Sequence, residues 1–178
     1  MSENLKTSRY NNGDLIPIVT DNAALSALTT GSRSWYDNDS TTYENPYGNL
    51  YNWYAVNDPR KLCPTGWHVP THDEWTILTT YLEGETVAGR KMKSTGTDYW
   101  IYESPGTNNS SGFSALPGGF RSDFDGSFYD IRGFAFFWSA TEYDDSFAWI
   151  RALYNNVGFV DGYSNGKPSG ASVRCLKD

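Results

Sequence analysis

Residues 62–75, "LCPTGWHVPTHDEW", contain the clearest helix start in the chain. Pro70 holds the backbone extended just before Thr71, whose hydroxyl can accept a hydrogen bond from a free N–H of the first helical turn. Glu74 follows three residues later and completes the pattern of a capping box. Asp73 adds negative charge near the positive end of the helix dipole. The sequence therefore predicts a helix that begins directly after Thr71.

The residues that follow indicate the length of this helix and its buried side. We expect it to run to about Glu83, because the next residue, Gly84, is of a type that commonly ends helices. Apolar side chains recur at helical spacing and predict one buried face. These side chains are Trp75, Leu78, Tyr81 and Leu82.

The same stretch contains three side chains that often carry chemistry, Cys63, His68 and His72. Pro70 separates the two histidines, so they cannot lie one turn apart on a continuous helix, as a metal-binding pair four residues apart would. His72 falls in the exposed first turn of the predicted helix. We therefore favour structural or surface histidines, with metal ligands as the alternative.

Cys175 is the only other cysteine and lies 112 positions after Cys63 (175 − 63). Two cysteines are too few for a disulfide-rich scaffold, and no positioned base identifies a catalytic thiol. We favour a disulfide with Cα atoms within about 7 Å of each other, which would contribute about 4 kcal/mol to stability in the chain-entropy model. Two buried free thiols, or a reactive or metal-bound cysteine, are the alternatives.

Length and charge limit the classes of protein that the chain can belong to. At 178 residues and 38% hydrophobic content, it is expected to form one domain, residues 1–178, with a substantial core. The net charge of −7 and the absence of a Lys or Arg cluster argue against nucleic acid as a partner. No apolar run approaches the roughly 20 residues of a membrane span, so no membrane insertion is expected.

Aromatic residues are unusually frequent, at 16% of the chain, and accompany 17 glycines. This composition predicts a core of large rings that cross short strands and loops. Tyr and Trp also suit binding surfaces, because they offer a large contact area at a small cost in rotamer entropy.

The order of patterns along the chain predicts an α+β fold. Residues 1–60 read as loops, with a core segment at 48–56, and residues 86–94 predict a second, short helix. From Gly112 onward, strand-like segments alternate with Asp-Gly and Asn-Gly turn signals. The predicted strands are 112–122, 134–141, 146–154 and 172–178, and the predicted turns are 124–127, 142–145 and 160–170.

Eight segments, taken in order, carry a resemblance to a known family. They are "ENLKTSRYNNG", "YGNLYNWYAV", "CPTGWHVPTHDEW", "AGRKMKSTG", "GFSALPGGFR", "FWSATE", "AWIRAL" and "SVRCLKD". Through them the chain resembles the Fibrobacter succinogenes major paralogous domain family over nearly its whole length. That family is similar in turn to the formylglycine-generating-enzyme and C-type-lectin-like folds. In these folds a segment like "HVPTHDEW" opens a helix, and the last strand ends near an arginine, here Arg174.

The resemblance implies a C-type-lectin-like α+β fold, with two helices, a twisted antiparallel sheet and long irregular loops. It also implies an extracellular or cell-surface location in a bacterium. The chain departs from the family at two places. Members usually begin with a strand ahead of the "ENL" segment, which we expect to be missing here, and Ala171 stands where an aromatic residue is more common.

Catalysis and cofactor binding are not expected. A formylglycine-generating enzyme, the enzymatic alternative, would need a reactive cysteine pair, whereas Cys63 and Cys175 are better explained as a link between the helix start and the final strand. Acidic side chains could bind calcium, the alternative to having no cofactor, but their spacing matches no calcium loop. We interpret them as exposed turn residues. They are Asp123, Asp125, Glu142, Asp144 and Asp145.

The predicted ligand-binding residues lie in the late loops, between Arg121 and Lys167. These segments are rich in Tyr, Asn, Asp, Ser and Gly, the residue types that adaptable recognition loops use. The predicted site residues are Tyr129, Tyr143, Tyr154, Asn155, Asn156 and Tyr163. Rings inside the strand-like segments are assigned to the core, with a neighbouring leucine: Phe136, Trp138, Trp149 and Leu153.

The sequence thus predicts a non-catalytic module that binds a glycan or a protein receptor, and it predicts no particular oligomeric state. An alternative is a variable receptor-binding protein that a mutagenic retroelement diversifies. Such proteins place variable Tyr, Asn, Asp and Ser residues in the late loops of this fold. A near-identical template repeat beside the gene, differing at adenines, would distinguish the two.

Overall fold

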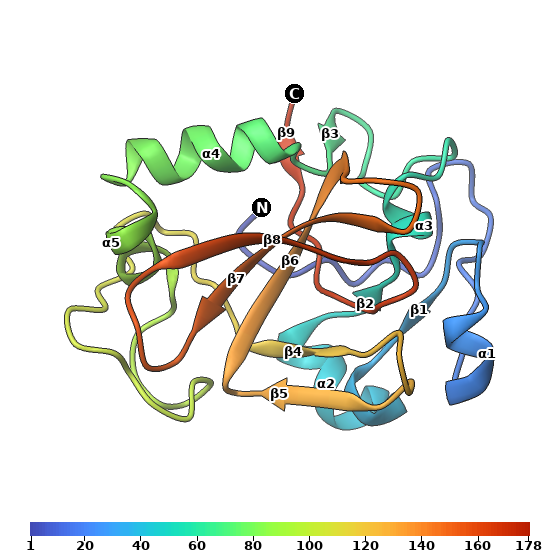
Figure 1. Ribbon diagram of the computed structural model, residues 1–178, viewed down its shortest axis with the longest axis horizontal. Coiled ribbons are helices and arrows are strands. Elements are labelled where there is room, and N and C mark those ends of the chain that lie inside the picture. The colour runs from blue at the N-terminus through green and yellow to red at the C-terminus, as the bar shows by residue number, and fades with distance from the viewer.

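The computed structural model describes residues 1–178 and has the predicted α+β architecture (Figure 1). Its main sheet has five strands in the order β5-β4-β6-β7-β8. The sheet is mixed, because β4 and β6 are parallel while every other neighbouring pair is antiparallel. The prediction of an antiparallel sheet is therefore wrong at this pair, since β6 crosses to the far side of β4. The strands are β4 Gly118–Arg121, β5 Phe128–Ile131, β6 Phe134–Glu142, β7 Phe147–Tyr154 and β8 Val160–Gly166.

The predicted helix start after Thr71 is confirmed. Helix α4 spans His72–Tyr81, and both hydrogen bonds of the capping box are present. The Thr71 hydroxyl accepts from the backbone N–H of Glu74 at 3.2 Å, and the Glu74 carboxylate accepts from the backbone N–H of Thr71 at 2.8 Å. Glu83 and Gly84 adopt positive φ, which ends the helix. Tyr81 is 84% exposed, so its assignment to the buried side is wrong. It lies about 120° from Trp75 around the helix axis.

The second predicted helix is confirmed as α5, Glu85–Met92, with Ala88 and Met92 fully buried. The prediction that residues 1–60 are mostly loops is wrong in detail, because this region forms several short elements. Polar caps start three of its helices: Asp21, Asp39 and Asn52 each accept a hydrogen bond from a first-turn N–H. These elements are α1 Asn22–Ser26, β1 Arg33–Ser34, η1 Tyr36–Asn38, α2 Ser40–Tyr47, β2 Leu50–Tyr51 and α3 Trp53–Val56.

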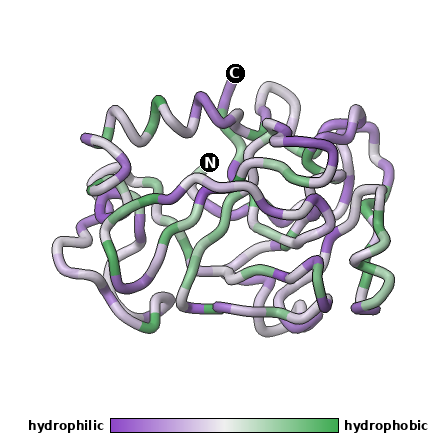
Figure 2. The backbone as a smooth tube through the Cα atoms, viewed as in Figure 1, coloured by the Kyte–Doolittle hydropathy of each residue, from purple (hydrophilic) through white to green (hydrophobic).

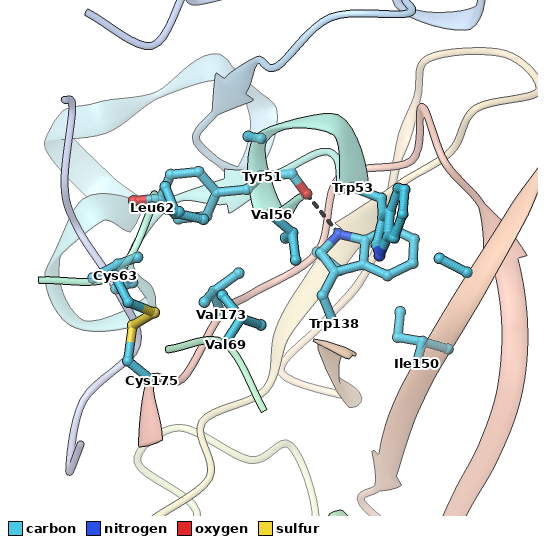
Figure 3. Packing of buried hydrophobic residues seen from close by; sticks show 14 of the residues in the cluster. Tyr51, Trp53, Val56, Leu62, Cys63, Val69, Trp138, Ile150, Val173 and Cys175 are labelled. Atoms are coloured by element: carbon cyan, nitrogen blue, oxygen red, sulfur yellow. Dashed lines mark hydrogen bonds between the residues drawn. A yellow bond between two sulfur atoms is a disulfide. The ribbon is translucent and has the colours of Figure 1, made fainter. Parts of the chain in front are cut away.

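The C-terminal segment joins distant parts of the fold. Residues 170–172 pass between β4 and β6, with bridges from Gly170 to Arg121 and from Ser172 to Phe137. Only Leu176–Lys177 of the predicted strand 172–178 forms a regular strand, β9, which pairs with β3, Trp67–His68. The predicted disulfide is confirmed: Cys63 and Cys175 are bonded, with their Cα atoms 5.9 Å apart (Figure 3).

Alternate residues of β6 and β7 send their side chains into two separate clusters. One contains Trp138 and Ile150 together with Tyr51 and Trp53 from the predicted core segment (Figure 3). The Trp138 indole N–H donates to the Tyr51 carbonyl at 2.7 Å. In Figure 2 the apolar residues of these strands run through the middle of the molecule, with hydrophilic stretches toward its outside.

The second cluster lies on the other face of the same strands and is covered by α4 and α5. It contains Phe137, Leu153 and Val160 from the sheet, with Trp75 and Met92 from the two helices. We call this side of the sheet the covered face. On the opposite face, α3 packs near Trp138, and no helix lies over the part toward the β7–β8 turn (Figure 1).

Candidate functional site

Five partly exposed rings share the sheet face opposite α4 and α5. Strand register places them there: Phe120 lies opposite Tyr129, Phe134 opposite Tyr154, and Tyr163 opposite the buried Ile150. Directly opposed residues of an antiparallel pair point to the same face. We call the set of Phe120, Tyr129, Phe134, Tyr154 and Tyr163 the aromatic face.

Four of these rings are held in a connected stack by edge-to-face and tilted contacts. The centroids of Phe120 and Tyr129 are 5.7 Å apart, and those of Phe134 and Tyr154 are 4.8 Å apart. Phe136, a core ring, joins the two pairs at 5.0 Å from Phe120 and 5.9 Å from Phe134. Such contacts fix the ring orientations. The aromatic face is therefore a rigid surface supported from below by the core.

Carboxylates fix the hydroxyl groups of the aromatic face. The Tyr129 hydroxyl donates to Asp125 at 2.5 Å, and the Tyr154 hydroxyl donates to Asp161 at 2.8 Å. The first bond lowers the pKa of Asp125 to about 2. Burial, followed by the Asp161 hydrogen bond, raises the pKa of Tyr154. At neutral pH the tyrosines are therefore neutral and the Asp125 carboxylate is charged.

The surroundings of the aromatic face are acidic. Burial, followed by the charges of Asp161 and Asp130, raises the pKa of Tyr163 to about 12. Neither aspartate forms an ion pair with a basic side chain, and neither does Asp125. The face thus offers apolar rings beside carboxylates that have no cationic partner within the chain.

The buried Lys93 holds the turn at one end of the aromatic face. Its ammonium donates to the Tyr154 carbonyl at 2.8 Å, the Val157 carbonyl at 2.7 Å and the Ser104 hydroxyl at 2.6 Å. Burial lowers the pKa of Lys93 to about 8. Lys93 thereby ties the β7–β8 turn to α5. This role has no signal in the sequence, because a lysine in a helix-like segment is ordinarily solvent-exposed.

Three predicted site residues, Tyr129, Tyr154 and Tyr163, come together on the aromatic face. They lie on strands and not in loops, which corrects the prediction. Residues 160–170 were predicted as a turn because of their Gly signals, yet most of them form the edge strand β8. A side chain at Gly162 would collide with the Arg151 guanidinium, and one at Gly166 with the Asp123 carboxylate. These glycines make room for neighbouring side chains.

The other three predicted site residues lie away from these rings. Asn155 and Asn156 are in the β7–β8 turn, where Asn156 borders a separate hollow of about 290 Å³ between the turn and α5. Tyr143 lies at the far end of β7 and contacts Trp149, with ring centroids 5.1 Å apart. Trp149 is only partly buried and packs on His72, so its assignment to the core is wrong, whereas those of Phe136, Trp138 and Leu153 are confirmed.

Phe120, Phe134 and Asp161 also belong to this surface and were not among the predicted site residues. The period-2 alternation of residues 134–141 could have indicated that Phe134 and Phe136 share a face. It could not show which face lacked a cover.

The acidic turn residues mostly serve the backbone or pair with local groups. Asp144 accepts hydrogen bonds from two backbone N–H groups of its own turn, Asp123 accepts from the Ser169 hydroxyl, and Glu142 pairs with Lys167. No group of three or more His, Cys, Asp or Glu side chains is arranged to hold a metal ion.

The two histidines of residues 62–75 have local partners. His68 contacts Asp178 at 2.6 Å and Glu74 at 3.0 Å, and the Asp178 hydrogen bond raises its pKa. Burial lowers the pKa of His72, which packs on Trp149 with centroids 4.1 Å apart.

His68 also borders the largest of the four main hollows, about 460 Å³, beside the Cys63 end of the disulfide. The four main hollows are not lined by the rings of the aromatic face, which lie on an open surface.

Comparisons with known proteins identify a family and no close relative of known role. The model of a family described as the Fibrobacter succinogenes major domain matches residues 1–177. No curated protein and no solved structure matches the chain. None of the helices has the length and apolar character needed to cross a membrane.

Proposed function

The chain belongs to the Fibrobacter succinogenes major domain family, and we propose that it is a non-catalytic recognition module that binds a protein receptor through the aromatic face. One observation carries this proposal: five partly exposed rings lie together on the part of this sheet face that α3 does not cover.

Single exposed rings are ordinary, but a group of exposed rings on one face is typical of a surface that contacts a partner. Tyr129 is 43% exposed and Tyr163 is 38% exposed, although both could be replaced by polar residues without opening the core. Rings of this kind are the side chains that dominate binding at protein interfaces. Because the stack already fixes four of the five rings, binding would cost little side-chain entropy.

The acidic surroundings favour a protein receptor that presents Lys or Arg side chains. Asp125, Asp130 and Asp161 have no basic partner, and an incoming cation would meet both a carboxylate and a ring face. The aromatic face is open, whereas small ligands are usually enclosed by a pocket. A glycan that stacks on the tyrosines is the other outcome that a binding screen must distinguish.

Several features support a role without catalysis and a location outside the cytoplasm. Cys63 and Cys175 form a disulfide, so neither is a free nucleophile, and disulfides persist mainly in oxidising compartments. The resemblance of the sequence to C-type-lectin-like folds is consistent with the mixed sheet flanked by two helices. We therefore propose a surface or secreted bacterial protein of that fold. If a retroelement diversifies the chain, the exposed positions of β5 and β8 would be the variable ones.

The test is a binding screen with a matched pair of variants. The wild-type chain is screened against a panel of bacterial and host surface proteins and against a glycan array. The double variant Tyr129→Ser, Tyr163→Ser should lose binding to the protein that is found by about a hundredfold, as loss of two interface rings does. The control Tyr81→Ser removes a more exposed tyrosine from α4, on the other side of the sheet, and should bind normally. Binding only to glycans would show that the ligand is a glycan and not a protein. Equal binding by the double variant and the wild type would disprove the site.

A further inference from the structure

A second candidate site lies on the covered side of the sheet, beneath α4. An apolar hollow of about 200 Å³ separates α4 from the segment before β4 and from the two chain ends. Trp75, Leu78 and Phe113 line its interior, while Met1 and Leu176, both more than 40% exposed, border its opening. The hollow is distinct from the aromatic face, because the sheet lies between them.

The hollow is lined almost entirely by apolar atoms, and the one buried cation that borders it is Arg174. The indole nitrogen of Trp75 has no hydrogen-bond partner, but it exposes less than 1 Å² of accessible surface, so its N–H does not open into the hollow and other atoms of the ring line it.

The Arg174 side chain borders the hollow and is only 2% exposed. Its four hydrogen bonds go to the Asn4 amide oxygen and to the carbonyls of Met1, Phe113 and Ser114, all of which are neutral. A guanidinium has five N–H donors, so one remains. Arg174 forms no ion pair with any carboxylate.

The single acidic residue of the lining does not neutralise this charge. One oxygen of Glu74 accepts from the backbone and hydroxyl of Thr71, and the other contacts His68. Glu74 is therefore occupied at the start of α4. Burial lowers the pKa of Arg174 to about 10, and the side chain remains charged at neutral pH.

We propose that this hollow binds a small monocarboxylate with an apolar body, whose carboxylate meets the Arg174 guanidinium while the body fills the space between Leu78 and Phe113. Charge complementarity selects the carboxylate, because an anion would pair with a buried cation that has only neutral partners. The volume of the hollow, about 200 Å³, suits a ligand body the size of one ring, since an apolar cavity of about 150 Å³ holds a benzene ring.

Phenylacetate is a suitable probe, because it joins one ring to one carboxylate. Its binding is followed by NMR of the tryptophan indole N–H signals, with the Trp75 signal identified by its loss in Trp75→Phe. We expect a saturable shift of the Trp75 signal. Phenylacetamide, which has nearly the same shape without the charge, should bind about tenfold more weakly or worse.

A pair of neighbouring substitutions on α4 provides the control. Leu78→Trp should fill the hollow and abolish the phenylacetate shift, whereas Ile77→Trp, at a residue 68% exposed on the same helix, should leave it unchanged. The proposal is overturned if phenylacetate produces no saturable shift at Trp75, if the amide binds as tightly as the acid, or if Leu78→Trp binds normally.

Discussion

The two faces of the central sheet both carry aromatic residues, which form a buried core on one face and a partly exposed surface on the other. Phe134 and Phe137 belong to one strand, three positions apart, and therefore point to opposite faces. Phe137 is fully buried under α4 and α5, whereas Phe134 stays partly exposed on the aromatic face. The difference arises from what covers each face and not from the strand itself. Ring content alone therefore cannot distinguish a core from a binding surface.

The largest expected effect lies away from both faces, at the disulfide. Replacing Cys63 and Cys175 with Ser should lower the free energy of unfolding by about 4 kcal/mol, because the bond closes a long loop. Chemical denaturation of the oxidised wild type and the double variant measures this loss. At a temperature where the variant remains folded, its receptor binding should be unchanged. A binding defect in the folded variant would mean that the aromatic face depends on the disulfide.

The next effect compares the two faces directly. Phe137→Ala should cost about 3–4 kcal/mol of unfolding free energy, since it leaves a cavity under the helices. Phe134→Ala should cost less than half as much, because its ring already contacts solvent and the gap can fill with water. Urea denaturation of both variants tests the difference. Equal costs would show that the aromatic face is as much a part of the core as the covered face.

A smaller effect concerns the helix that covers the sheet. Thr71→Ala removes the N-cap of α4 and should cost about 1 kcal/mol. Thr71→Ser keeps the hydroxyl and provides the control, with an expected change near zero. A thermal melt that is the same for Thr71→Ala and wild type would mean that the cap does not stabilise α4.

The smallest effect is a pH dependence with opposite signs at the two histidines. The raised pKa of His68 gives stability that is complete below the unfolded pKa of about 6.5 and is lost as the pH rises through the folded pKa. The lowered pKa of His72 gives stability that is present above about pH 6.5 and is lost as the pH falls through its folded pKa.

Unfolding measurements at several pH values test these signs. His68→Gln should lose more stability relative to wild type at about pH 5 than at about pH 8, and His72→Gln should show the reverse trend. The same trend in both variants would contradict the assigned environments.

Local signals predicted the parts of the fold that local chemistry determines. Thr71 and Glu74 indicated the start of α4, and residues 134–141 and 146–154 indicated the two central strands. The disulfide between Cys63 and Cys175 was the favoured interpretation, but the sequence alone left two free thiols, or a reactive or metal-bound cysteine, as alternatives. The mixed order of the sheet could not be predicted, because the parallel pairing of β4 with β6 depends on contacts between distant residues.

The candidate site was predictable only in part. Residue composition indicated Tyr129, Tyr154 and Tyr163. They lie on one face because β8 pairs with β7, and this strand was predicted as a turn because of its glycines. Tyr143 has the same local signature and lies elsewhere. Lys93 had no local signal at all, because its role depends on carbonyl groups more than 60 residues away.

Hydrogen exchange of the chain with and without its bound receptor tests most directly whether the aromatic face is the recognition surface. We expect slower exchange in residues 128–131 and 160–166, the two edge strands that carry Tyr129 and Tyr163, and no change in α4. Protection confined to α4 or to the segment around Cys63, with β5 and β8 unaffected, would contradict it.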